Sequence, residues 1–363
     1  MPLTPTECVS PAIEHAKQQL FKPFQFGQWT RLAFVGLLAG EMATGSCPGG
    51  GGGWNRPQSQ GGGDQFLSFA PPPFDPSKLG PYLGLIIFVA LLVCVLVLVL
   101  MYVNSVFRFI LLQSVVQKRC SISEGWRRWQ RPGRRFFLWQ LVYQLVLGIG
   151  LAILIGIPLG IAALMGWLQQ PKAHLAPLIL GGMIFAGLLI VFFLIAVCVH
   201  VLAKDFLVPL MAYSDLDFAD GWSRLLAMMK TERSNYFVYL LLKLGLSIVA
   251  FILFGIVTFF VVLLFLIPVG GVGVLAILLG KSAGVGWTPA TIAIAAVFAA
   301  VAFVVLMYII ALISVPAIVF FPAYSIYFFA ARYPALDALL HPRAPEPPPL
   351  PPLPQPPLPQ PAG

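Results

Sequence analysis

Four polar side chains that could do chemistry lie within or beside long apolar runs of this chain: Asn104, His200, Glu41 and Lys243. Polar groups in hydrocarbon are costly, so they pair with other polar groups or mark the path of an ion, proton or substrate. Asn104 and His200, near the inner ends of two predicted spans, could line a polar path or hydrogen-bond neighbouring helices. Lys243 lies two turns into a span, and its ammonium is expected to reach the inner surface. Glu41 lies close to the outer loop, where it could equally be solvated.

The sequence shows no arrangement of residues typical of a catalytic or metal-binding site. The four histidines are dispersed and no Cys-x-x-Cys pair occurs. Gly280-Lys281-Ser282 resembles part of a phosphate-binding loop, but Leu275 occupies the position where that loop requires a glycine. We therefore expect a protein that is not an enzyme and that has no metal or cofactor.

Long uncharged segments dominate the chain. Charged residues make up 10% and apolar residues 59%, against roughly 25% and 45–50% in a soluble domain. Several stretches exceed the roughly 20 residues that cross a bilayer core, and a backbone in hydrocarbon favours helices because they satisfy their own hydrogen bonds. The predicted fold is an all-α, polytopic membrane protein with six transmembrane helices, within a membrane domain of residues 29–340. The predicted spans are about 29–45, 80–112, 136–168, 175–206, 236–267 and 289–322.

An internal repeat groups these spans into three helical hairpins. Ser121 to Trp126 aligns with Asp217 to Trp222, an offset of 96, and this alignment places Asn104 on His200 and Arg108 on Lys204. The phrase Ala212-Tyr213-Ser214 recurs 111 positions later as Ala323-Tyr324-Ser325. Small residues four apart, such as Gly36 and Gly40, are typical of helices that approach closely in lipid.

An amphipathic helix is predicted before each hairpin, lying flat in the inner headgroup layer. The first falls within residues 1–28. The second has Ile122, Trp126 and Trp129 on one face and is expected to end at Pro132-Gly133, where the chain turns into the bilayer. The third begins near Asp217.

Basic residues collect in the segments that connect the spans on one side. Their excess there predicts an inner (plasma) membrane protein with both termini cytoplasmic. Residues 118–135 carry seven basic residues and one acidic residue. Attraction to anionic lipid is worth about 1 kcal/mol per well-placed arginine, and interleaved tryptophans favour lipid over nucleic acid as the partner. The candidate lipid contacts are Arg127, Arg128, Arg131, Arg134 and Arg135.

Two segments have low complexity. The predicted outer loop at 46–79 is rich in glycine and proline, and the cytoplasmic tail at 341–363 is dominated by proline. The tail is expected to be a disordered polyproline II segment, which could act as a spacer or bind a partner protein with an aromatic groove.

The phrases Phe320 to Ser325 and Gly221-Trp222, together with the repeat, support a family comparison. The chain resembles uncharacterised bacterial six-span integral membrane proteins, which are related in pattern to the membrane domain of some glycerophosphodiester phosphodiesterases. The resemblance covers most of residues 10–340 and includes no catalytic motif. Those enzymes carry their chemistry in a separate soluble barrel domain, so the resemblance implies a membrane module without an activity.

These observations favour a non-enzymatic membrane module that acts as an anchor, a scaffold or a lipid-interacting protein. A transporter or channel-like protein for a small or lipidic molecule is the alternative, because repeats and interrupted spans are common in transporters. The deep parts of the spans are nearly bare of ionisable groups, which favours the module. A membrane-embedded enzyme that acts on lipid is the third possibility.

Overall fold

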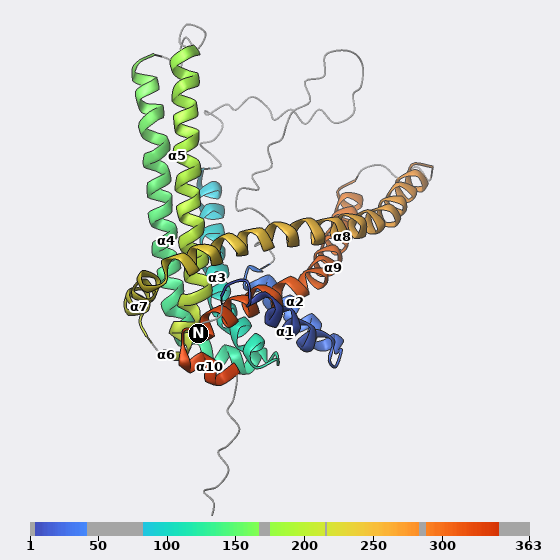
Figure 1. Ribbon diagram of the computed structural model, residues 1–363. Coiled ribbons are helices and arrows are strands. Elements are labelled where there is room, and N and C mark those ends of the chain that lie inside the picture. The colour runs from blue at the N-terminus through green and yellow to red at the C-terminus, as the bar shows by residue number, and fades with distance from the viewer. Residues whose placement is uncertain (1–3, 42–82, 167–174, 215, 283–287, 341–363) are drawn as a thin grey trace, which may run out of the picture.

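Helices form every regular element in the part of the chain that the structure describes, residues 4–41, 83–166, 175–214, 216–282 and 288–340 (Figure 1). The structure is a computed structural model. The predicted outer loop at 46–79 and the tail at 341–363 lie outside the described residues. The elements are α1 (Val9–Phe21), α2 (Phe26–Leu38), α3 (Leu83–Val116), α4 (Ile122–Leu164), α5 (Leu175–Leu202), the π-helix η3 (Ala203–Leu207), α6 (Val208–Ser214), α7 (Phe218–Thr231), α8 (Arg233–Ser282), α9 (Pro289–Ala330) and α10 (Pro334–Leu340).

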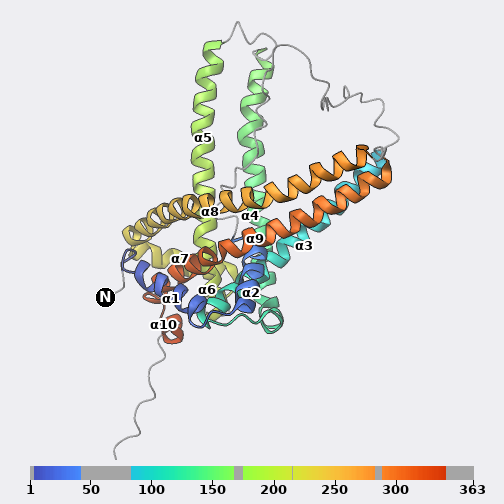
Figure 2. The same cartoon turned by 90° about the vertical axis from the view of Figure 1, so that its right-hand side faces the viewer.

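One end of the molecule contains nearly all of the packed core, and we call it the core end. There α1, α2, α6, α7 and α10 surround the last turns of α3 and α9 and the first turns of α4 and α8 (Figures 1 and 2). Aromatic rings fill its centre, with Tyr239 stacked on Phe328 at 4.6 Å and on Tyr324 at 5.1 Å between centroids. The side chains that reach this centre come from helices far apart in sequence, so the core end fixes how the long helices leave it.

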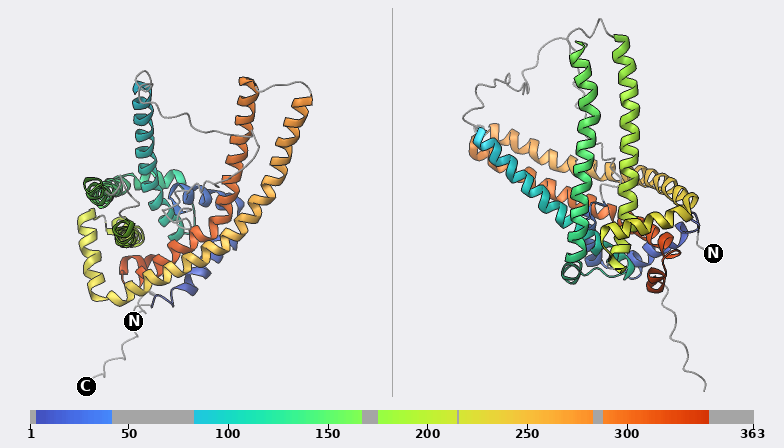
Figure 3. Two further views of the ribbon diagram at one scale, coloured as in Figure 1. Left: turned by 90° about the horizontal axis from the view of Figure 1, so that it is seen from above. Right: turned by 90° about the vertical axis from the view of Figure 1, so that its left-hand side faces the viewer.

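Five helical segments of the described residues are long and apolar enough to cross a membrane: Leu83–Val116, Ile122–Leu164, Ile179–Ser214, Arg233–Gly280 and Ala290–Ala330. Away from the core end they extend as α3, an α4–α5 hairpin and an α8–α9 hairpin, whose far ends lie apart when seen from above (Figure 3). Their apolar side chains there are exposed almost all round, as at Leu91, Leu145 and Phe259. A helix that is apolar on every side needs hydrocarbon or protein around it, so this is a multi-pass membrane protein.

The structure does not confirm the first of the six predicted spans, 29–45, of which residues 42–45 lie outside the described residues. The helix found there, α2, has 13 residues and a length of about 20 Å, too short for a hydrocarbon core about 30 Å thick. Its buried face packs on α9 at the core end, where a Cβ added to Gly36 would lie 2.5 Å from Cγ2 of Ile318. Over the described residues there are thus five span candidates, and the three-hairpin repeat stays a prediction.

The predicted interfacial helix before the second hairpin is also wrong in its form. Pro132 lies inside α4, which continues to Leu164 without a break. Its apolar face covers α3 and not a lipid surface, because Trp129 stacks on Phe109 at 5.8 Å and donates from Nε1 to Gln113. By contrast, α7 is a separate short helix between Asp217 and Glu232.

Candidate functional site

The π-helix η3 places two consecutive charged residues, Lys204 and Asp205, at the centre of the core end. Pro209 explains the local widening. Proline has no N–H, and its ring clashes with the carbonyl four residues earlier, here that of Asp205, so an α-helical ladder fails at this point. The backbone N–H of Val208 instead bonds to the carbonyl of Ala203, five residues earlier. Single π-turns within α-helices are rare and occur often at functional sites.

Lys204 forms an ion pair with Glu41, with 2.6 Å between Nζ and Oε2. Both side chains are nearly inaccessible, at 10% and 4% exposure. Glu41 reaches this position because α2 ends at Leu38 and the chain turns through Gly40, whose φ is +73°. The interpretation of Glu41 as a residue near the outer loop that could be solvated is therefore wrong, since it lies buried at the core end.

Asp205 is bound from the other side by α8. Lys243 forms an ion pair with Oδ2 of Asp205, and the hydroxyl of Tyr239 donates to the same oxygen at 2.9 Å. Tyr239 and Lys243 are one turn apart on one face of α8, so both reach the carboxylate. The prediction that Lys243 extends to the inner surface is wrong, because Asp205 offers a buried counter-charge one helix away.

Asn104 and Arg108, one turn apart on α3, both contact the end of α2. Asn104 donates from Nδ2 to the carbonyl of Leu38 at 2.9 Å, and Arg108 donates from Nε to that of Ala39 at 3.4 Å. These are carbonyls that a helix C-terminus leaves without partners within the helix. Asn104 therefore joins α3 to α2.

His200 lies beside Arg108, with 3.5 Å between its Nε2 and the guanidinium Nη2. A guanidinium can only donate, so this contact requires Nε2 of His200 to be an acceptor. The imidazole also stacks on Tyr143, whose hydroxyl donates to the carbonyl of Ala196 at 2.6 Å. His200 thereby links α3, α4 and α5. The repeat aligns Asn104 with His200: Asn104 lies one turn before Arg108 on α3, and His200 contacts Arg108 from α5.

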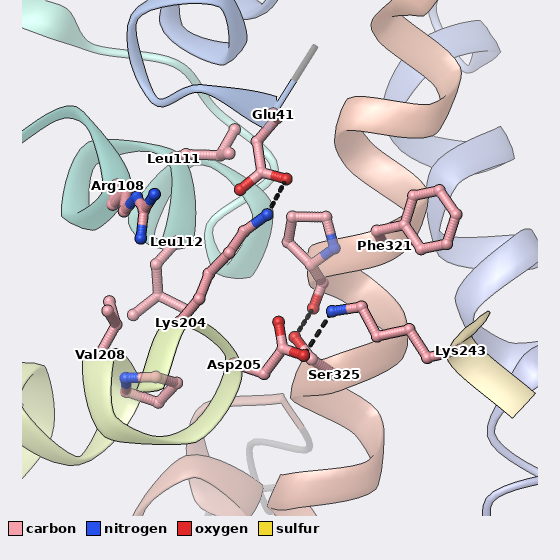
Figure 4. A pocket seen from close by; sticks show the side chains of 12 residues that line it. Glu41, Arg108, Leu111, Leu112, Lys204, Asp205, Val208, Lys243, Phe321 and Ser325 are labelled. Carbon is pink, nitrogen blue, oxygen red and sulfur yellow. Dashed lines mark hydrogen bonds and ion pairs between the residues drawn. The ribbon is translucent and has the colours of Figure 1, made fainter. Parts of the chain in front are cut away.

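A small cavity of about 30 Å³ lies among these charges (Figure 4). Its polar lining consists of six side chains from α3, η3, α8, α9 and the end of α2: Glu41, Arg108, Lys204, Asp205, Lys243 and Ser325. Sequence reasoning missed Asp205, and it noticed Arg108 only as the repeat partner of Lys204. The available signal was a Lys-Asp pair at the end of an apolar run, with Asp205 four residues before the helix-breaking Pro209.

The predicted lipid contacts form an exposed basic surface on the first turns of α4: Arg127, Arg128, Arg131, Arg134 and Arg135. Two of them have partners within the chain. Nε of Arg135 lies 3.1 Å from Oδ1 of Asp217, and the guanidinium of Arg128 lies 5.1 Å from the ring centroid of Trp129. The surface is separate from the buried charges, which lie on α3, η3, α8 and the segment after α2.

The five long apolar helices and the buried charges at their common end define a multi-pass, α-helical membrane protein. The chain belongs to a family of unknown function, DUF7544, which matches residues 3–339. Comparison with curated proteins and with solved structures gives no match. These comparisons show no link to the membrane domain of glycerophosphodiester phosphodiesterases, so that resemblance stays a prediction.

Proposed function

We propose that this protein is a non-enzymatic membrane module that binds anionic lipids at its core end. We place that end at the cytoplasmic face of a bacterial inner membrane, because basic residues concentrate there. In this proposal the proline-rich residues 341–363 act as a spacer or as a ligand for a partner protein. The observation that carries this proposal is the position of the exposed arginines relative to the uncharged part of α4.

The position follows from helix geometry. No charged residue occurs in α4 from Phe136 to its end at Leu164, and we propose that the edge of the hydrocarbon lies at Phe136. With a rise of 1.5 Å per residue, Arg134 and Arg131 lie about 3 and about 8 Å beyond that edge along the axis. The headgroup layer is roughly 5–8 Å thick, so both guanidiniums reach lipid phosphates. Arg127 lies about 14 Å beyond the edge and faces water.

This difference in depth supplies a matched test. The double variant Arg131→Gln/Arg134→Gln removes two charges in the headgroup layer, and Arg127→Gln/Lys230→Gln removes two other exposed charges of the core end. The measurement is native mass spectrometry of phosphatidylglycerol bound to the full chain, titrated against phosphatidylcholine. At about 1 kcal/mol per residue, the first pair loses about 2 kcal/mol, or roughly 30-fold in affinity. Equal losses in both pairs, or no loss in the first, would disprove the proposal.

The buried charges favour a second function, transport of a small molecule or ion. Intramembrane ionisable groups often mark the path of an ion or substrate, and π-turns occur often at functional sites. The cluster lies where the apolar part of α8 begins, after Lys243, and not midway along the spans. If this protein is a transporter, replacing His200 by leucine is expected to abolish solute uptake in proteoliposomes without changing the yield of folded protein. The membrane module is supported if lipid affinity depends on Arg131 and Arg134 and if no uptake depends on His200. The opposite result supports the transporter.

A further inference from the structure

The cavity at the core end contains an arginine whose hydrogen-bonding capacity is largely unused. Arg108 is 8% exposed, and a guanidinium has five N–H donors. Its Nε and Nη2 make contacts of 3.4 and 3.5 Å, near the limit for a hydrogen bond, and its buried Nη1 has no partner. Lys204 and Lys243, on the same cavity, are each bound to a carboxylate. Arg108 is therefore the group in this cavity that still requires an acceptor.

The charges around the cavity do not balance. Among the described residues that line it there are three cations, Arg108, Lys204 and Lys243, and two carboxylates, Glu41 and Asp205. An uncompensated charge away from water is unfavourable unless a counter-ion or a pairing group is present. A water molecule could accept a hydrogen bond from Nη1 but would leave the excess positive charge. A monovalent anion would satisfy both requirements.

The size of the cavity limits the anion. Its volume of about 30 Å³ is roughly two to three times the 10–15 Å³ that a cavity needs to hold one water molecule. A chloride-sized ion fits such a space, whereas a lipid headgroup with its glycerol does not. The apolar walls, including Leu112 and Phe321 on opposite sides (Figure 4), supply no competing acceptor.

We infer that this cavity binds one small monovalent anion of chloride size, held by Arg108 with Lys204 and Lys243 close by. The geometry of η3 makes the site possible, because the π-turn directs Lys204 toward Glu41 and Asp205 toward Lys243 on either side of the same space. The bound anion neutralises the cluster and stabilises the junction of α2, α3, η3 and α8. This inference goes beyond the proposed function and does not rest on lipid binding.

The test measures thermal unfolding of the full chain in detergent without added lipid, with sodium chloride or sodium gluconate at equal ionic strength. A ligand that binds only the folded state raises the melting temperature with its concentration. The melting temperature is expected to rise with added chloride or bromide. It is not expected to rise with gluconate, which is too large for the cavity. Inorganic phosphate is also expected to give no rise. No difference between chloride and gluconate, or a larger rise in phosphate, overturns the inference.

Variants locate the effect. Arg108→Gln is expected to lose the chloride-dependent rise, and Arg127→Gln, which removes an exposed arginine, is expected to keep it. Should Arg108→Gln fail to fold, Arg108→Lys keeps the charge and is expected to weaken chloride binding at least tenfold. Glu41→Gln removes one carboxylate and is expected to strengthen chloride binding. A chloride effect that is unchanged in the Arg108 variants, or a weaker one in Glu41→Gln, places the anion elsewhere and overturns the assignment.

Discussion

Lys204 donates from Nζ to Oε2 of Glu41 over 2.6 Å, although 163 positions separate the two residues in the chain. The pair connects the segment after α2 to the π-helix at the end of α5. Both partners are buried, so the contact is not a surface ion pair whose contribution solvent screens. Each charge is tolerated in this place because the other is present.

Removing one member of this pair is expected to destabilise the fold strongly. Glu41→Gln leaves Lys204 buried without its counter-charge, and loss of one partner of a buried pair costs about 3–5 kcal/mol. Lys204→Met should cost a similar amount, and the double variant Glu41→Gln/Lys204→Met should cost less than the sum of the two. The measurement is a double-mutant cycle of unfolding free energies in mixed micelles.

The exposed pair Arg135–Asp217 serves as the control, because its side chains are 43% and 68% exposed. Removing either partner there is expected to change the unfolding free energy by less than about 1 kcal/mol. Additive effects of the two buried substitutions would contradict the coupling.

The apolar runs predicted the long helices well because membrane helices follow from local composition. The predicted spans 80–112, 175–206 and 289–322 overlap α3, α5 and α9, and the elements begin within three residues of them. The predictions failed where tertiary packing determines where a helix ends or continues. The stop of α2 at Leu38 depends on its contacts with α3 and α9, and the passage of α4 through Pro132 depends on Trp129 packing against Phe109.

The site was only partly predictable for the same reason. Glu41, Lys243, Asn104 and His200 were recognised as polar groups in apolar surroundings, which requires no three-dimensional information. That Glu41 and Lys243 line one cavity with Arg108 and Asp205, and that His200 contacts the same Arg108, depends on how several helices cross and on the π-turn before Pro209. No pattern in the local sequence specifies those crossings.

Gly36 is expected to tolerate no larger side chain. A Cβ at this position would lie 2.5 Å from Cγ2 of Ile318, a branched residue that is itself buried. Overpacking of this kind costs about 1–3 kcal/mol, so Gly36→Ala should unfold at lower denaturant concentration. Gly148 has no atom within 4 Å of the same position, and Gly148→Ala should be neutral or stabilising by up to about 1 kcal/mol. A neutral Gly36→Ala would show that α2 does not approach α9 as described.

The docking of α1 is expected to weaken in acid. Burial lowers the pKa of His15 below its usual range, although the hydrogen bond from its ring to the carbonyl of Val115, 2.9 Å long, opposes this effect. The unfolded state therefore binds more protons than the folded state once the pH falls below about 6.5. Stability contributed by neutral His15 is complete above that pH and declines below it.

The measurement for His15 is the melting temperature in detergent at about pH 7.5 and about pH 5.5. The wild type should lose more stability between these conditions than His15→Gln, which does not titrate in this range. Equal losses would show that other groups cause the acid sensitivity.

The orientation of the chain can be tested by thiol labelling after the five native cysteines are replaced. The excess of lysine and arginine at the core end predicts that this end faces the cytoplasm, since basic loops are retained on that side.

Lys230 is exposed at the core end, and Leu164, at the far end of α4, is 90% exposed. An impermeant maleimide should label Lys230→Cys only in inverted membrane vesicles and Leu164→Cys only in spheroplasts. The two positions are separated by the whole uncharged length of α4, which exceeds the bilayer core at about 1.5 Å per residue. Labelling of both cysteines from one side would mean that α4 does not span the membrane, whereas reversed labelling of the two would place the basic surface and its lipids in the opposite leaflet.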